Sequence, residues 1–116
     1  MLFVQYPKCS TCKKAKSWLE NHGIEFDERH IVENNPNADE LRRWHKMSDL
    51  PLRRFFNTSG MLYRELELKN KLPAMSEDEM IELLASNGML VKRPLLVLDD
   101  TVLVGFREPE WEKLLD

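Results

Sequence analysis

The residues best suited to chemistry in this sequence are two cysteines three positions apart, Cys9 and Cys12, in a Cys-Ser-Thr-Cys segment. A thiolate is a strong nucleophile, but an unperturbed thiol with a pKa of about 8.5 is mostly protonated at neutral pH. The N-terminus of a helix favours the anion, and Lys8, Lys13 and Lys14 add positive charge nearby. The pattern predicts Cys9 as the nucleophile and Cys12, one turn later, as the thiol that resolves a bond formed on Cys9.

Other roles for this cysteine pair have weaker support. A structural zinc site needs four ligands, and the sequence has no second cysteine pair, while His22, His30 and His45 lack the paired spacing of a zinc finger. A c-type haem needs histidine directly after the second cysteine, where this chain has Lys13. Two inert buried thiols remain an alternative. A helix start with several lysines, however, favours a thiolate and thus a reactive thiol. We expect no metal.

A strand, a turn and a helix are predicted to position the cysteines. Residues 1–6 are a short apolar run that ends at Pro7, as in a buried strand. Residues 7–12 are expected to form a turn, with Ser10 and Thr11 as candidate helix caps. A helix is expected over 13–22, with apolar residues on one face and a stop at Gly23. The apolar residues between 24 and 32 suggest a second strand.

The rest of the chain predicts helices followed by a hairpin. A helix is expected over 39–47, and several short helices between 51 and 88, one of them capped by Ser76 and Glu79. Strands at 90–98 and 101–104 are joined by a turn at 99–100. A closing helix over 108–115 is expected to turn Trp111, Leu114 and Leu115 inward. This order, β-α-β-α, a helical insertion and β-β-α, predicts an α/β domain with a mixed sheet.

Composition narrows the function classes. The 116 residues suffice for one core, and at 42% hydrophobic and 32% charged residues the chain is typical of a globular protein. No apolar run approaches the ~20 residues of a membrane span, and the first residues lack the features of a signal peptide. We therefore expect a cytoplasmic protein without a membrane partner. The net charge of −3 offers no overall attraction for nucleic acid, so none is expected as a direct partner.

Longer motifs in the sequence resemble the arsenate reductase-related (ArsC/Spx) family of thioredoxin-fold proteins, in its CxxC-containing branch. The resemblance spans essentially the whole chain and rests on five segments: Tyr6-Pro7-Lys8-Cys9-Ser10-Thr11-Cys12-Lys13-Lys14-Ala15, Val32-Glu33-Asn34-Asn35-Pro36, Phe55-Phe56-Asn57-Thr58-Ser59-Gly60, Lys92-Arg93-Pro94 and Val104-Gly105-Phe106-Arg107. It implies a thioredoxin-like mixed sheet core (β-α-β … β-β-α) in a single domain, 1–116, with a helical insertion at about 37–88.

The resemblance also implies roles for individual residues. Cys9 matches the reactive cysteine, and Arg93 precedes a cis-proline, Pro94, that faces it. Arg107 matches an anion-binding arginine, whereas Asn57 stands where another arginine of that anion site is expected. An arginine can fork onto an oxyanion or a developing thiolate. The candidate catalytic residues are thus Cys9, Cys12 and Arg93, and the candidate anion- or substrate-binding residues are Lys8, Ser10, Thr11, Pro94 and Arg107.

Two functions follow from these residues. The first is a thiol–disulfide oxidoreductase, or arsenate reductase-like enzyme, acting on a disulfide or a small oxyanion. It would need no bound cofactor, only an external thiol reductant such as thioredoxin, glutaredoxin or glutathione. Cys12 is a departure from the glutaredoxin-linked arsenate reductases, which use one cysteine in this loop. The alternative is an Spx-type redox-sensing transcription regulator that binds the RNA polymerase α subunit. A weaker possibility is a relative that binds an anion without chemistry. We expect a monomer.

Overall fold

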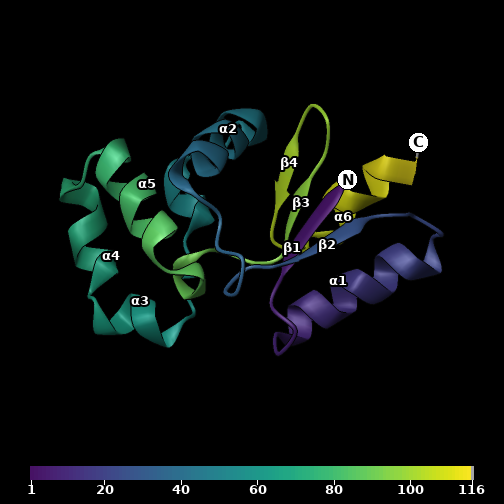
Figure 1. Ribbon diagram of the computed structural model, residues 1–116, viewed down its shortest axis with the longest axis horizontal. Coiled ribbons are helices and arrows are strands. Elements are labelled where there is room, and N and C mark those ends of the chain that lie inside the picture. Colours follow the sequence, from purple (N-terminus) through teal and green to yellow (C-terminus); the bar gives the residue numbers. More distant parts are fainter. Residues whose placement is uncertain (116) are drawn as a thin grey trace.

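The computed structural model describes residues 1–115 and contains one four-stranded sheet with helices around it (Figure 1). The strands are β1 (Leu2–Gln5), β2 (Asp27–His30), β3 (Leu95–Val97) and β4 (Val102–Val104). The α-helices are α1 (Ser10–Asn21), α2 (Ala38–Ser48), α3 (Met61–Glu65), α4 (Leu68–Lys71), α5 (Glu77–Ser86) and α6 (Glu108–Glu112). Short 3-10 helices are η1 (Leu52–Phe55), η2 (Leu72–Ala74), η3 (Gly88–Leu90) and η4 (Lys113–Leu115). Within residues 1–115, every helix is too short or too polar to cross a bilayer.

The strands lie in the order β2-β1-β3-β4. β1 runs parallel to β2 and antiparallel to β3, and β3 pairs antiparallel with β4. Parallel pairing of β1 and β2 requires a crossover, which α1 provides, whereas the β3–β4 hairpin needs only a short turn. The predicted mixed sheet and thioredoxin-like architecture are confirmed.

The two faces of the sheet bury different clusters of side chains. Phe3 and its partner Leu96 belong to a cluster with Ala15, Leu19 and Trp111, so α1 and α6 cover one face. The next pair along these strands, Val4 on β1 and Leu95 on β3, belongs to a larger cluster on the other face. The helices between β2 and β3 supply most of the remaining side chains of that cluster. This alternation follows from strand geometry, because successive side chains point to opposite faces. The helices between β2 and β3 form a lobe beside the sheet (Figure 1).

The helix that carries the cysteines begins earlier than expected. α1 starts at Ser10, so Cys12 lies in its first turn rather than in the preceding loop. The N-cap is Cys9, and its side chain makes no capping hydrogen bond, which corrects the proposed capping roles of Ser10 and Thr11. Gly23 follows the helix with a φ of 67°, so the expected glycine stop is confirmed.

Other sequence expectations were wrong in extent. The second strand comprises Asp27–His30 and lies between the apolar residues used to predict it, because β2 is an edge strand with polar side chains. The third strand is only Leu95–Val97, since Pro94 has no N–H for the ladder. Leu115 does not point inward and is 49% exposed. The helix at 76–86 has the predicted capping box.

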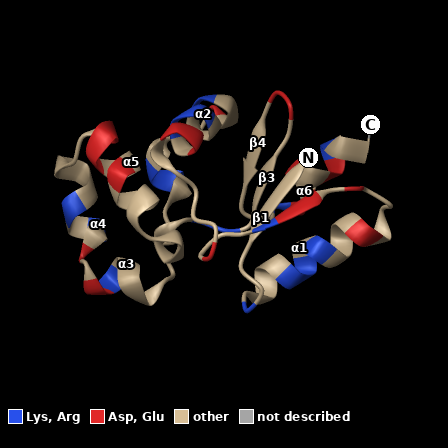
Figure 2. Cartoon of the chain, in the orientation of Figure 1, with Lys and Arg blue, Asp and Glu red and all other residues tan. Residues whose placement is uncertain are grey.

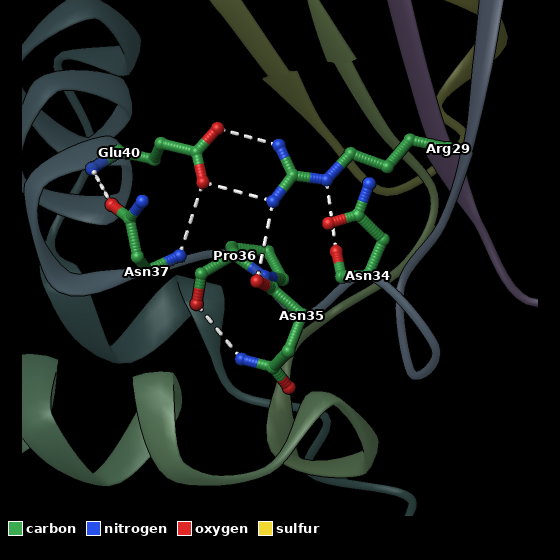
Figure 3. Close-up of polar contacts among 6 residues, drawn as sticks. All are labelled: Arg29, Asn34, Asn35, Pro36, Asn37 and Glu40. Atoms are coloured by element: carbon green, nitrogen blue, oxygen red, sulfur yellow. Dashed lines mark hydrogen bonds and ion pairs between the residues drawn. The ribbon is translucent and has the colours of Figure 1, made fainter.

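A polar network fastens α2 to the end of β2 (Figure 3). The Arg29 guanidinium binds both carboxylate oxygens of Glu40, with Nη2 at 2.8 Å from Oε1. It also donates to the backbone carbonyls of Asn34 at 2.8 Å and Asn35 at 3.2 Å. Glu40 in turn completes a capping box with Asn37 at the start of α2. One arginine of the sheet therefore fixes both the turn after β2 and the first turn of the helix.

The far end of the helical lobe returns to the same turn. Asn35 donates from its amide to the Ala85 carbonyl at 3.1 Å, near the end of α5. Gly88 packs so closely that a Cβ there would lie 2.1 Å from the Ile31 carbonyl oxygen. A side chain at this position would therefore force the backbones apart. The two contacts hold the C-terminal end of the lobe against the turn that follows β2.

We expect Glu40→Gln to lower the free energy of unfolding by about 2 kcal/mol at neutral pH, because a half-buried guanidinium loses its charged partner. The hydrogen bond from Arg29 lowers the pKa of Glu40 against the opposing effect of burial. The ion pair between Arg29 and Glu40 therefore contributes its full stabilisation above the unfolded-state pKa of about 4.3. This stabilisation is lost as the pH falls through the lower pKa that Glu40 has in the folded state. Urea unfolding at neutral pH and at about pH 3 should show the difference between the two proteins shrinking on acidification.

Asp39→Asn is the matched control on the same helix. Its carboxylate is 91% exposed and lies 3.7 Å from Arg42, so its loss should barely change stability. An equal cost for the two substitutions would contradict the role given to the Arg29–Glu40 pair.

Candidate functional site

Cys9 lies where β1 has ended and α1 begins. Its backbone N–H donates to the Tyr6 carbonyl at 3.0 Å, and its own carbonyl accepts from Lys13 N–H at 3.1 Å. The first bond closes the turn after β1, and the second is the first hydrogen bond of the helix. Cys9 is half-buried, whereas Cys12 is only 1% exposed. Both thiols are free, so the structure shows the reduced pair.

Hydrogen bonds favour the thiolate of Cys9. Burial alone would raise its pKa, but the backbone N–H and thiol of Cys12, the Arg93 guanidinium and the Thr11 N–H donate to the sulfur and together lower the pKa. Donors to the charged form stabilise it, and these donors lie at the positive end of α1. Cys9 therefore has the electrostatic environment of a reactive cysteine.

Cys12 has the opposite properties. Burial, followed by the proximity of the Cys9 sulfur, raises the pKa of Cys12 to about 12, against the lowering effects of the Tyr6 backbone and Arg93. Two thiolates so close together would repel each other, so one sulfur keeps its proton. Cys12 thus serves first as a hydrogen-bond donor to Cys9.

Arg93 is held in place from two directions. Its guanidinium carbon lies 5.0 Å from the centre of the Tyr6 ring, a cation–π arrangement, and Nη1 donates weakly to the Met89 carbonyl at 3.4 Å. The peptide bond between Arg93 and Pro94 is cis, as the resemblance implied. Tyr6, in the turn before Cys9, thereby aligns the arginine that donates to the sulfur.

Cys9 opens into a cavity of about 590 Å³, called here the thiol cavity. Its walls carry four cationic side chains, Arg54, Lys92, Arg93 and Arg107, and no Asp or Glu of residues 1–115 lines it. Arg107 contacts Glu110 at 3.8 Å, whereas the ion pairs found within the described residues involve none of the other three cations. The carboxylates gather elsewhere, for example on α5 and at the tip of the β3–β4 hairpin (Figure 2). The cavity is therefore suited to anions.

Backbone contacts bring the helical lobe to this cavity. Phe56 and Val91 form an isolated antiparallel bridge. Beside it, Lys92 N–H donates to the Phe55 carbonyl at 2.7 Å, and Asn57 N–H donates to the Leu90 carbonyl at 2.8 Å. These bonds fix the segment that carries Arg54 and Asn57 against the segment that carries Lys92 and Arg93.

Gly105 lets the segment after β4 approach Lys92 closely in the wall of the thiol cavity. It adopts a φ of 76°, and a Cβ there would lie 3.3 Å from the Lys92 side chain. Its N–H donates to the Pro94 carbonyl at 2.8 Å, and its carbonyl accepts from Trp111 Nε1 at 3.2 Å. A side chain at this position would be strained and would crowd Lys92.

The structure brings together only some of the residues proposed from the sequence. Cys9, Thr11, Arg93 and Arg107 line the thiol cavity, and Cys12 lies buried beside Cys9. Pro94 is buried in the chain behind Arg93. Lys8 and Ser10 are exposed and do not line the cavity.

Sequence reasoning missed Arg54 and Lys92 as cavity residues. Asn57 does line the cavity without a charge, but Arg54, three residues earlier, supplies a guanidinium from η1. Lys92 was visible only as part of the Lys-Arg-Pro motif, and its approach to Gly105 appears only in the structure. Within residues 1–115, no three His, Cys, Asp or Glu side chains are grouped as a metal site would require.

Comparison with known proteins relates this site to one family. The model of the ArsC family matches residues 4–114. The chain is 57% identical to the Bacillus subtilis protein YusI, with 97% of this chain and 96% of YusI covered. It is 32% identical to the regulatory protein MgsR of the same organism, with 98% of this chain and 89% of MgsR covered.

Solved structures agree with this relationship. An ArsC-family related protein from Bacteroides fragilis is 58% identical and superposes with a TM-score of 0.96, covering 97% of this chain and 95% of that one. An arsenate reductase from Vibrio cholerae is 30% identical with a TM-score of 0.81, covering 96% and 94%. The chain is thus similar over nearly its full length both to a protein described as an arsenate reductase and to one described as a regulatory protein.

We expect the rate at which iodoacetamide alkylates Cys9 to rise with pH, with a midpoint below the pKa of about 8.5 of free cysteine. The reason is that only the thiolate reacts, and a lowered pKa forms the thiolate at lower pH. Arg93→Gln removes a donor to the thiolate and should raise this midpoint by about one pH unit. Mass spectrometry assigns the label to Cys9, because Cys12 is buried.

Arg107→Gln is the control, because it removes a cation from the same cavity without removing a donor to the sulfur. Equal shifts in both variants would mean that the general field of the cavity, rather than the Arg93 hydrogen bond, sets the pKa.

Proposed function

The chain belongs to the ArsC family, and we propose that it is a thiol–disulfide oxidoreductase in which Cys9 and Cys12 form the redox pair. The observation that carries this proposal is the contrast between the two thiols. Cys9 has a lowered pKa and faces a cationic cavity, while Cys12 is buried, protonated and hydrogen-bonded to it. A nucleophile beside a protected resolving thiol is the arrangement that disulfide reduction needs.

In the first step, the Cys9 thiolate attacks one sulfur of a substrate disulfide. A bond forms between Cys9 and that sulfur, the substrate disulfide breaks, and the other half leaves as a thiolate. Arg93 donates to the Cys9 sulfur beforehand and is placed to steady negative charge as it moves to the leaving sulfur. The other cations of the cavity favour the approach of an anionic substrate.

In the second step, Cys12 resolves the mixed disulfide. Once the Cys9 sulfur is bonded and neutral, its charge no longer opposes ionisation of Cys12, so the pKa of Cys12 falls. Cys12 then loses its proton, attacks the Cys9 sulfur and expels the remaining half of the substrate. Two electrons pass to the substrate, and the Cys9–Cys12 disulfide formed is returned to the dithiol by an external thiol such as thioredoxin, glutaredoxin or glutathione.

We expect Cys9→Ser to reduce turnover of a small disulfide below about one hundredth of the wild-type rate, because the nucleophile is lost. Cys12→Ser should still undergo the first step and accumulate a mixed disulfide on Cys9. Turnover is measured in the presence of thioredoxin and its reductase, and the trapped species by intact mass. Ser17→Ala, an exposed change on the same helix, serves as a control for fold and handling. Full turnover in Cys9→Ser would overturn the proposal.

A second candidate is redox-controlled transcription regulation. The observation that favours it is the similarity to MgsR, a regulatory protein, over 98% of this chain. In this function the Cys9–Cys12 disulfide would form and break without turnover, and its formation would change a surface that binds the RNA polymerase α subunit.

Capture on the immobilised C-terminal domain of the RNA polymerase α subunit tests the second candidate. If it holds, one redox state of the wild-type chain is retained at least about tenfold more than the other. The Cys9→Ser, Cys12→Ser double variant cannot form the disulfide, so its capture should not change with oxidant. Absence of binding in both redox states would exclude this function.

A further inference from the structure

A second cavity, called here the insertion cavity, lies in the helical lobe next to the thiol cavity. Its volume is about 560 Å³. Apolar side chains from several elements line it, namely Phe56, Tyr63, Leu72, Pro73, Met75 and Met80. Phe56 is 1% exposed and Leu72 is 6% exposed, so the floor is part of the core, while the methionines provide an adaptable apolar surface.

The two cavities share a wall. Arg54 and Lys92 line both of them. The hydrogen bond from Lys92 N–H to the Phe55 carbonyl, at 2.7 Å, ties together the two segments that carry these cations. A ligand bound at Cys9 that extends past Arg54 and Lys92 meets the apolar side chains of the insertion cavity.

The charge of the lining residues specifies what could occupy the two cavities together. Arg53 and Lys69 add two more cations to the insertion cavity, and no carboxylate of residues 1–115 lines either cavity. The chain as a whole carries a net charge of −3, so this concentration of cations is local. An occupant must offer negative charge at the shared wall and an apolar group beyond it.

On the basis of the proposed function, we propose that the substrate is a polypeptide disulfide whose cysteine is followed by acidic residues and then by a large apolar residue. The cysteine sulfur reacts with Cys9, the acidic side chains meet Arg54 and Lys92, and the apolar side chain enters the insertion cavity. An inorganic oxyanion would leave the apolar floor unused. An extended peptide advances by about 3.3–3.6 Å per residue. It therefore presents its cysteine, its acidic residues and its apolar residue in turn to Cys9, to the shared wall and to the insertion cavity.

The reaction remains that of the proposed mechanism. The Cys9 thiolate attacks the cysteine sulfur of the peptide, a Cys9–peptide disulfide forms, and the group previously bound to the peptide leaves as a thiolate. Cys12 then attacks Cys9 and releases the peptide thiol. The insertion cavity adds recognition and takes no part in the electron transfer.

Chromogenic peptides test this assignment. Each carries a cysteine linked by a disulfide to 2-nitro-5-thiobenzoate, followed by Glu-Glu-Phe, Gln-Gln-Phe, Glu-Glu-Ala or Lys-Lys-Phe. Release of the coloured thiolate reports the first step. We expect the Glu-Glu-Phe peptide to react about tenfold faster than the Gln-Gln-Phe and Glu-Glu-Ala peptides at subsaturating concentration, and the Lys-Lys-Phe peptide to be slowest.

Protein variants locate each preference. Arg54→Gln should reduce the preference for glutamate over glutamine to below about threefold while leaving the preference for Phe over Ala. Met75→Gln changes only the insertion cavity, so it should reduce the preference for Phe over Ala and leave the preference for glutamate over glutamine. Arg43→Gln is the matched control, because its exposed arginine lines neither cavity and its loss should change neither preference. Urea unfolding verifies that each variant is folded.

The outcomes separate this inference from the proposed function. Equal rates for the four peptides, or preferences that persist in both Arg54→Gln and Met75→Gln, would overturn the peptide assignment and leave the reductase intact. No release from any peptide, together with no reaction with Ellman's disulfide, would overturn the reductase itself.

Discussion

The stabilisation of one anionic sulfur is the interaction on which the proposed chemistry depends. Burial of Cys9 works against its ionisation, and donors from Thr11, Cys12 and Arg93 reverse that effect. Two of these donors, Thr11 and Cys12, lie in the first turn of α1, and the third, Arg93, comes from the segment that leads into β3. The strand β1 that delivers Cys9 is central in the sheet, so the site is anchored to the most constrained part of the fold.

The helical lobe belongs to the site as much as the sheet does. It contributes Arg54 and Asn57 to the wall of the thiol cavity, and a single β-bridge between Phe56 and Val91 fixes its distance from Arg93. The Arg29 network at its other attachment holds the lobe in one orientation. The lobe thereby adds one guanidinium, that of Arg54, to the cations that Lys92, Arg93 and Arg107 bring to the cavity.

Local signals predicted much of the fold, and long-range placement explains what they missed. β1, the stop at Gly23 and the capping box of α5 depend on residues adjacent in sequence and were recognised from their patterns. The edge strand β2 is polar and has no alternating apolar residues. The sequence prediction of this strand therefore rested on the apolar residues on either side of it. Arg54 resembles any surface arginine in a short helix, and only the bridge beside it turns it toward Cys9's cavity. The cysteine pair was identifiable because its spacing, the predicted helix start and the adjacent lysines are all local in sequence.

The near-complete burial of Cys12 determines how the cysteine pair meets an oxidant. Peroxide can reach the sulfur of Cys9 but not that of its neighbour, so oxidation begins at a single atom. A sulfenic acid formed there would lie beside the Cys12 thiol, and condensation of the two, with loss of water, would give the disulfide of the proposed mechanism. Through that disulfide, the buried neighbour would keep Cys9 from the irreversible sulfinic and sulfonic states.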